Sequence, residues 1–151
     1  MYKLNLPEFD LRLKNAEGKV WIFDGIRKKY IVLTPEEWVR QHFVNYLVAH
    51  KKYPRSLIRV ESGLVYNELM KRSDIVVHNR QGMPWLVVEC KAPTQSMSEQ
   101  VLAQASVYNS RLKAQYVCVT NGMIHLCAQV DWESRRTMQL HELPEFPEID
   151  R

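Results

Sequence analysis

An aspartate and a nearby Glu-x-Lys triplet, Asp74 and Glu89-Cys90-Lys91, are the residues of this chain whose types and spacing could do chemistry. Carboxylate oxygens hold hard cations such as Mg²⁺. A cation and a lysine together can act on an attacking water and on the charge that develops during phosphodiester hydrolysis. The sequence therefore predicts a divalent-metal nuclease, provided that the fold brings these side chains together.

The residues between Asp74 and Glu89 predict the element that would join them, an antiparallel β-hairpin. β-Branched and aromatic runs at 76–77 and 85–88 flank the turn-forming segment 79–84. Such a hairpin would carry one carboxylate at the start of its first strand and the other at the end of its second.

The register of this hairpin decides whether the carboxylates meet. If His78 pairs with Trp85, Asp74 falls opposite Glu89, with Cβ atoms roughly 5 Å apart. Side chains alternate between the two faces of a strand. The expected face of Glu89 therefore carries three further residues, Trp85, Val87 and Lys91.

Two capping motifs predict the helices on either side of the hairpin. Thr34-Pro35-Glu36-Glu37 can start a helix that runs to about Lys52, because Pro54 follows. Ser96-Met97-Ser98-Glu99 can start a second helix that runs to about Lys113. The remaining β-rich runs predict strands at 20–23, 30–33, 57–61, 115–119, 123–130 and 137–141.

This order of elements predicts an α/β (α+β) fold with an αβββαβ core. Its mixed sheet would be flanked by helices and extended by β-hairpins at both ends. The length of 151 residues suits one domain, expected at 1–141. An acidic, proline-containing tail at 142–151 is expected to be loosely ordered.

Charge and cysteine content bound the environment of the chain. The formal charge is +4, and the tail contributes −3, which leaves +7 on residues 1–141. That surplus favours a polyanionic partner, although ordinary solubility explains it equally well. No run approaches a membrane span, and the N-terminus has no signal-peptide core. The three cysteines, in apolar surroundings, are expected to be buried thiols of a cytoplasmic protein.

Taken together, these features resemble the PD-(D/E)xK, or restriction-endonuclease-like, nuclease superfamily. The resemblance is to the N-terminal nuclease domain of type I restriction enzyme R subunits in particular. It spans roughly residues 20–125 and is carried by five motifs, PEEWVRQ (35–41), RSDIVV (72–77), VVECKAP (87–93), QASVYN (104–109) and VTNG (119–122).

The resemblance implies roles for the acidic and basic residues of the hairpin. Asp74 and Glu89 would bind Mg²⁺, with Mn²⁺ as a substitute, and the Cys90 carbonyl would be a third ligand. Lys91 would orient or activate the attacking water and steady the charge on the phosphate. Arg72, next to Asp74, is a candidate for DNA contact.

The resemblance also implies supporting residues on the two helices. Gln104 and Tyr108 match a Gln-x-x-x-Tyr element that lies beside the active site and contacts DNA or the lysine. Residues i and i+4 share one side of a helix, and an aromatic ring there could stack on an unpaired base.

A carboxylate of the first helix is expected to support the site, and both Glu36 and Glu37 are candidates. Helical geometry of 100° per residue favours Glu36 as the inward one, held by Arg40 or reaching a second metal. Arg40 is also a candidate for DNA contact.

The chain carries no G-x-x-x-x-G-K-[ST] phosphate loop and has no room for a helicase motor. The predicted partner is DNA, with a restriction or helicase subunit and a homodimer as further options. Two alternatives stay open. The chain could be a catalytically silent nucleic-acid-binding or assembly module, or a subunit whose partner supplies sequence recognition.

Overall fold

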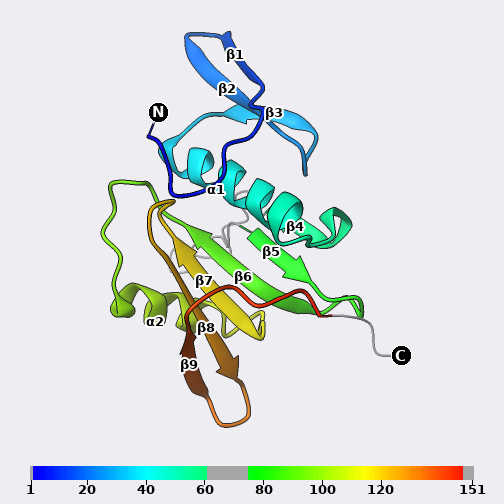
Figure 1. The fold of residues 1–151 in the computed structure, drawn as a ribbon, viewed down its shortest axis with the longest axis vertical. Helices are drawn as coiled ribbons and strands as arrows, with labels where there is room; N and C mark the ends of the chain where they lie inside the picture. Colours follow the sequence, from blue (N-terminus) through cyan, green and yellow to red (C-terminus); the bar gives the residue numbers. More distant parts are fainter. Residues whose placement is uncertain (1, 61–74, 148–151) are drawn as a thin grey trace.

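The computed structural model describes residues 2–60 and 75–147, and Figure 1 shows their arrangement. Two β-sheets lie on either side of the first helix, α1 (Pro35–Asn45). The smaller sheet contains β1 (Leu13–Ala16), β2 (Lys19–Asp24) and β3 (Lys29–Val32) in that order. Of its strands, β1 was not predicted from the sequence.

The larger sheet has six strands in the order β4-β5-β6-β7-β8-β9. Its neighbours pair antiparallel except for β6 and β7, which are parallel. The parallel pair requires a crossover, and α2 (Glu99–Tyr108) provides it. The predicted mixed sheet with flanking helices is confirmed. The strand bounds are β4 Ile58–Val60, β5 Ile75–His78, β6 Pro84–Cys90, β7 Tyr116–Thr120, β8 His125–Asp131 and β9 Arg136–Leu140.

The β5–β6 hairpin follows the predicted register over most of its length. Ile75 pairs with Val88, and the next two pairs, Val76–Val87 and Val77–Leu86, continue that register. The predicted pairing of His78 with Trp85 is wrong, because the register shifts after Val77 and His78 pairs with Pro84. A bulge of this kind turns the strand end and re-aims its side chains.

Trp85 shows the effect of the shift. Its ring packs against Tyr53, Tyr116 and Phe146 at centroid distances of 5.6, 5.2 and 5.4 Å. This places Trp85 in the same core cluster as Leu86, on the α1 side of the sheet. The expectation that Trp85 shares the face of Glu89 is therefore wrong.

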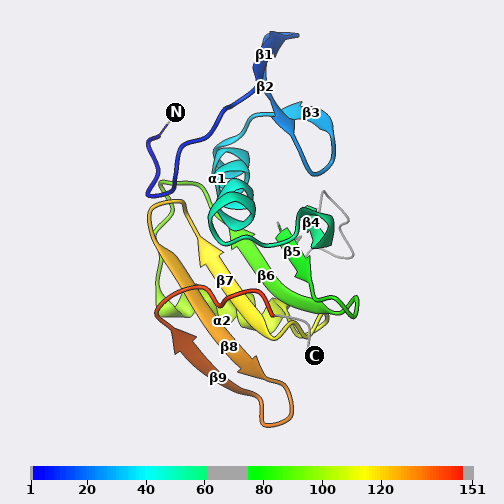
Figure 2. The same cartoon turned by 45° about the vertical axis from the view of Figure 1, so that its right-hand side comes forward.

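The two helices cover opposite faces of the six-stranded sheet (Figure 2). On one face, Phe43 and Leu47 pack with Leu86, Val88 and other buried residues. On the other face, α2 contributes two residues to a second cluster with strand residues of β7 and β8, formed by Leu102, Ala105, Val117, Val119, Ala128 and Val130. Both faces of β5, β6 and β7 are buried, and these three strands are nearly continuous apolar runs.

α1 begins as the sequence predicts. The Thr34 hydroxyl accepts a hydrogen bond from the Glu37 backbone N–H at 3.1 Å, and Pro35 is the first helical residue. The helix ends at Asn45 rather than near Lys52 and continues as a π-helical turn, Tyr46–His50, with a short 3₁₀ turn at Arg55–Leu57 before β4.

α2 is shorter than predicted at both ends. Ser98, not Ser96, caps it, accepting a hydrogen bond from the Val101 N–H at 3.2 Å. At the other end, the buried side chain of Asn109 bonds the backbone of Ala114, five residues later. Its Nδ2 donates to the Ala114 carbonyl at 3.0 Å, and its Oδ1 accepts from the Ala114 N–H at 3.2 Å. These side-chain hydrogen bonds replace a continuation of the helix beyond Tyr108. Leu112, which was expected on the helix, is exposed.

Residues 142–147 pack on the core, so the expectation of a loosely ordered tail is wrong for them. Leu143 is buried, and Phe146 packs against Tyr53 and Trp85. The Tyr53 hydroxyl donates a hydrogen bond to the Pro144 carbonyl at 2.5 Å. The burial of two apolar side chains, together with this hydrogen bond, holds the segment against the core.

The three cysteines are buried thiols, as predicted. Cys118 on β7 lies directly opposite Cys127 on β8. A hydrogen bond with Cys127, together with burial, raises the pKa of the Cys118 thiol well above its usual value. No helix within residues 2–60 and 75–147 has the length and apolar character needed to cross a membrane.

Candidate active site

Glu89 and Lys91 form an ion pair at the carboxyl end of β6. Lys91 Nζ lies 2.6 Å from Glu89 Oε2, and the two side chains are only 14% and 11% exposed. Removing charges from water is costly unless they are paired. The sequence prediction that these two side chains converge is borne out by this contact.

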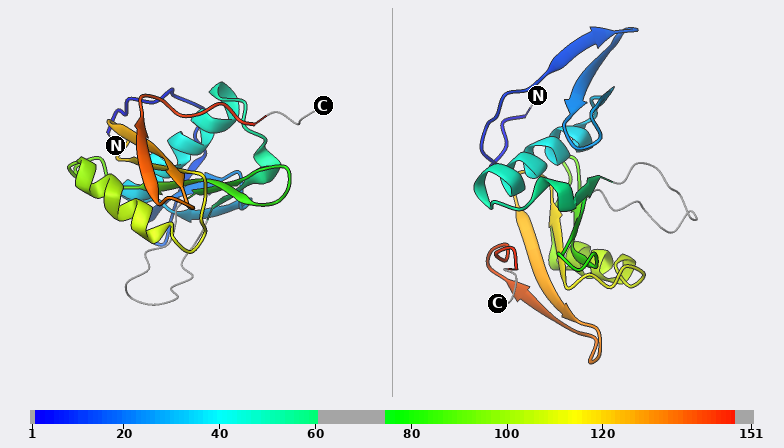
Figure 3. Two further views of the ribbon diagram at one scale, coloured as in Figure 1. Left: turned by 90° about the horizontal axis from the view of Figure 1, so that it is seen from below. Right: turned by 90° about the vertical axis from the view of Figure 1, so that its right-hand side faces the viewer.

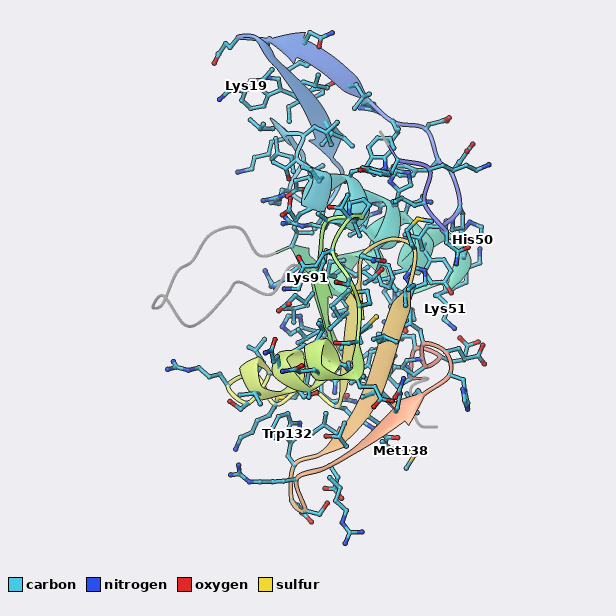
Figure 4. All side chains as sticks on the ribbon, turned by 90° about the vertical axis from the view of Figure 1, so that its left-hand side faces the viewer. Lys19, His50, Lys51, Lys91, Trp132 and Met138 are labelled. Carbon is cyan, nitrogen blue, oxygen red and sulfur yellow. The ribbon has the colours of Figure 1, made fainter. Side chains whose placement is uncertain are left out.

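The strand places the two partners by alternation. Glu89 pairs with Val119 of β7, so its side chain lies on the α2 side of the sheet with Val87. Cys90 points the other way, into the core beneath α1. Figure 4 labels Lys91 between α1 and α2, on the flank of the sheet. The pair thus sits at the sheet end, beyond its apolar interior.

The backbone around Lys91 is held by the turn between β7 and β8. The Lys91 N–H donates to the Thr120 carbonyl at 2.8 Å. The Thr120 hydroxyl lies 2.6 Å from His125 Nδ1 and accepts a hydrogen bond from the Gly122 N–H at 2.9 Å. Asn121 Nδ2 donates to the Gln95 carbonyl at 2.8 Å, which ties down the segment that follows Lys91.

Thr120, Asn121 and His125 hold the backbone beside Lys91, which the sequence did not predict. The VTNG motif (119–122) carries part of the resemblance, but its bonds to Lys91 and Gln95 depend on tertiary contacts. Burial lowers the pKa of His125, opposed by a hydrogen bond with the Asn5 backbone. The imidazole is therefore neutral at pH 7 and can bond to both Thr120 and Asn5.

Asp74 and Arg72 lie outside the described residues. The described β5–β6 register ends at Ile75–Val88, one pair short of Asp74 and Glu89. Their convergence stays a prediction.

The carboxylate of α1 that points inward is that of Glu37 and not that of Glu36, so the sequence prediction of Glu36 as the inward residue is wrong. Glu36 is exposed, whereas Glu37 is 9% exposed. Glu37 Oε1 lies 2.6 Å from Arg40 Nη1 and 3.5 Å from Arg27 Nη2. The expected pairing of Arg40 with Glu36 is replaced by this contact.

The reason is the smaller sheet. Arg27 also bonds Asp24 at 2.7 Å, so residues of the β2–β3 turn draw Glu37 inward from the side of α1 away from the six-stranded sheet. Every residue from Val39 to Val44 is buried, because α1 packs against both sheets. Because α1 is buried against a sheet on each of two sides, the position of one apolar stripe cannot decide whether Glu36 or Glu37 points inward.

The remaining predicted residues are placed as follows. Arg40 is 4% exposed, which leaves little surface for the predicted DNA contact. Gln104 is exposed, on the side of α2 away from its buried residues. Tyr108 is the last residue of α2, and its side chain lies outside the description. The predicted roles of Gln104 and Tyr108 stay predictions.

A metal could be held at this site by the carboxylate of Glu89, a hard oxygen donor of the kind that Mg²⁺ prefers. Residues 2–60 and 75–147 contain no group of three or more His, Cys, Asp or Glu side chains that could hold a metal ion. A full ligand set therefore needs Asp74 or main-chain oxygens beside Glu89.

Comparison with known families decides the class of the protein. The family described as type I restriction enzyme R protein N terminus matches residues 35–144. The chain belongs to this family. No curated protein matches it.

Membership in the restriction R-protein family confirms the resemblance seen in the sequence. The matched range takes in α1, the six-stranded sheet, α2 and the Glu89–Lys91 pair. It associates the chain with type I restriction and with a restriction-related nuclease domain. The match begins at Pro35 and leaves β1, β2 and β3 outside it.

Proposed function

We propose that this protein is a Mg²⁺-dependent deoxyribonuclease that hydrolyses phosphodiester bonds at the Glu89–Lys91 end of β6. The observation that carries the proposal is the ion pair itself, two opposite charges 2.6 Å apart with little exposure. A hydrophobic pair there would cost less to bury. Together with the restriction R-protein family match, the pair is better explained by chemistry than by stability.

Each residue has a stated task in this proposal. Glu89 and Asp74 would hold the cation, with the Cys90 carbonyl beside them. When bound, the cation would supply Lewis-acid stabilisation of the phosphate charge. Lys91 Nζ, held next to the Glu89 carboxylate, would donate a hydrogen bond to the attacking water or to a phosphate oxygen.

Two further features support precise placement of Lys91. Its backbone is tied to Thr120, and the chain that follows is tied through Gln95 to Asn121. Catalytic groups work best when their supports leave them one position. The Thr120–Asn121 turn provides such support.

The test is cleavage of supercoiled plasmid and of linear single- and double-stranded DNA in Mg²⁺, Mn²⁺ or EDTA. Lys91→Ala removes the amine and keeps the carboxylate. It should lower metal-dependent cleavage by about 10²- to 10³-fold, the usual effect of losing one charge-stabilising donor.

Lys51→Ala is the matched control. Lys51 also pairs with a glutamate, Glu145, at 2.9 Å, and its side chain is 16% exposed. Figure 4 shows Lys51 on the other flank of the molecule from Lys91. Cleavage by this variant should stay within about twofold of the parent, as for a surface change far from the site.

The alternative is a catalytically silent DNA-binding or assembly module. DNA binding with no cleavage in any metal would favour it over the nuclease. Cleavage that Lys91→Ala and Lys51→Ala reduce equally would also count against the proposal. Cleavage that appears only after a second subunit is added would assign the activity to an assembly.

A further inference from the structure

One face of the β1–β3 sheet gathers basic and aromatic side chains. In an antiparallel sheet, directly opposed residues share a face. Lys14 of β1 opposes Trp21 of β2, and Phe23, two residues further along β2, opposes Tyr30 of β3. Alternation adds Arg12 and Lys19 to the same side. We call this set the basic–aromatic face: Arg12, Lys14, Lys19, Trp21, Phe23 and Tyr30.

The cations of this face lie over its rings. The Arg12 guanidinium carbon is 5.1 Å from the Phe23 ring centroid, and Lys14 Nζ is 4.3 Å from the Tyr30 centroid. Phe23 and Tyr30 meet edge to face, with centroids 5.3 Å apart. The rings are half-buried and the three cations are exposed. A molecule that binds this face can therefore contact the rings and the charges together.

The charge of the face is positive. Within strands β1, β2 and β3 it carries no carboxylate, because Asp24 alternates to the opposite face, where Arg27 holds it. Glu17 lies in the β1–β2 turn and not on a strand. A polyanion would meet no opposing charge on the strands.

Most of the basic–aromatic face points away from the body of the protein. The opposite face of this sheet carries Ile22 and Asp24, each only 1% exposed, on the α1 side, where Asp24 reaches Glu37 of α1 through Arg27. Arg12 and Phe23 also line a cavity with residues of α1, so the open part of the face is the part around Lys14, Lys19 and Tyr30. Figure 3 shows β1 and β2 projecting beyond α1, and Figure 4 labels Lys19 at the far end of the projection. The face is thus open to a large partner.

We propose that the basic–aromatic face binds single-stranded DNA. Unpaired bases offer free π-faces, and stacking on aromatic side chains combined with cations along the backbone is how such strands are bound. A duplex hides its base faces and would use the cations alone. The face lies outside the family match, which starts at Pro35. Figure 4 labels Lys19 on the projecting β1–β2 strands and Lys91 between α1 and α2, so the face is a second surface distinct from the Glu89–Lys91 site.

The cation–ring contacts do not block this use. An exposed cation–π contact is weaker than the stacking of a base on an aromatic ring. A base can therefore take the place of Lys14 over Tyr30, which frees the ammonium for a phosphate. The choice of DNA over RNA rests on the proposed function, whereas strand binding by the face does not.

The first experiment compares two lysines on opposite faces of one sheet. Lys14→Gln and Lys29→Gln remove the same charge, but Lys29 is exposed on the other face, opposite Asp24. Binding of a labelled oligo-dT is followed by fluorescence anisotropy in EDTA, on a Lys91→Ala background. Lys14→Gln should raise the Kd about three- to tenfold through a lost phosphate contact, with Lys29→Gln within about twofold.

The second experiment tests the ring. Tyr30→Leu keeps an apolar side chain on β3 and should weaken oligo-dT binding about tenfold, the effect of losing one stacked base. The salt dependence of binding should not change, because no phosphate contact is lost. Thermal unfolding shows whether the variant folds; if it does not, the lysine comparison decides.

Three results would overturn the inference. These are equal weakening by Lys14→Gln and Lys29→Gln, duplex bound as tightly as oligo-dT, and an oligo-U bound more tightly than oligo-dT. Because binding is measured without metal or cleavage, failure here leaves the nuclease proposal standing. Absence of cleavage would likewise leave this inference standing.

Discussion

The two sheets on either side of α1 are built on different physical principles. In the six-stranded sheet, every residue of β6 from Trp85 to Cys90 is buried. In the smaller sheet, β1 is exposed at three of its four positions. The first sheet is held by burial, and a charge such as Glu89 stands out within it. The second is held by strand pairing, by ring contacts and by a polar junction with α1, in which Asp24, Arg27, Glu37 and Arg40 are linked by ion pairs. Its remaining charges therefore face solvent.

The largest test of this comparison pairs two phenylalanines. Phe43 of α1 is fully buried against the six-stranded sheet, and Phe43→Ala should lower the free energy of unfolding by about 3–5 kcal/mol. Phe23 of β2 is half-buried, and Phe23→Ala should cost about 1 kcal/mol. Urea denaturation followed by circular dichroism measures both. Equal losses would remove the distinction between the sheets.

The polar junction is tested by two adjacent glutamates. Glu37→Gln removes the carboxylate that Arg40 and Arg27 share and should lower the free energy of unfolding by about 3 kcal/mol, as for one broken partner of a buried pair. Glu36→Gln is the matched control on the exposed side and should change it by less than about 0.5 kcal/mol.

The same pair separates the orientation of the first-helix carboxylate from its role. If it supports cleavage, Glu37→Gln should lose more activity than Glu36→Gln, once both are assayed well below their unfolding temperatures. The reverse order would restore the assignment made from the sequence and contradict the geometry of the junction.

The smallest expected effect concerns Asp24. Burial opposes its ionisation, but hydrogen bonds from the Arg27 backbone and guanidinium, with the charge of Arg27, hold the pKa of the carboxyl below 3.8. A depressed pKa contributes stability above the unfolded-state pKa of about 3.9 and loses it as pH falls through the folded-state value.

Asp24→Asn should therefore cost about 1–2 kcal/mol at neutral pH, the scale of hydrogen bonds to a charged group. Below about pH 4, the unfolded-state pKa, the gap to the parent should begin to narrow, and it should close only once the pH falls below the depressed folded-state pKa, where the folded parent is protonated as well. Denaturant titrations from pH 7 to pH 3 measure this. Asp10→Asn, at an exposed carboxylate, is the control, and a gap that stays constant with pH would contradict the linkage.

Local signals were sufficient for much of the larger sheet and its helices. Thr34 and Pro35 mark the start of α1 because capping chemistry is local. The β5–β6 register at Ile75–Val77 is the one assumed for the predicted hairpin, and the Glu89–Lys91 contact follows from i, i+2 geometry on one strand. Each of these depends on residues close in sequence.

What the sequence could not supply depends on contacts between distant segments. Glu37 turns inward because Arg27, itself held by Asp24, reaches it from the other sheet. Asn109 ends α2 early by bonding Ala114, and Phe146 holds the tail against Trp85. The bulge after Val77 has no composition signal of its own. None of these four features produces a periodic pattern in the sequence from which it could be predicted.

The three buried thiols can be used to measure how often the centre of the six-stranded sheet opens. Cys90, Cys118 and Cys127 come from three neighbouring strands at the centre of the six-stranded sheet, and all are buried. A thiol reagent can reach them only when these strands separate. The rate of alkylation in native buffer thus measures how often the middle of the sheet opens. The extent of partial alkylation at each cysteine would show whether β6, β7 and β8 open as one unit. No engineered probe is needed, because the cysteines are native to the sequence.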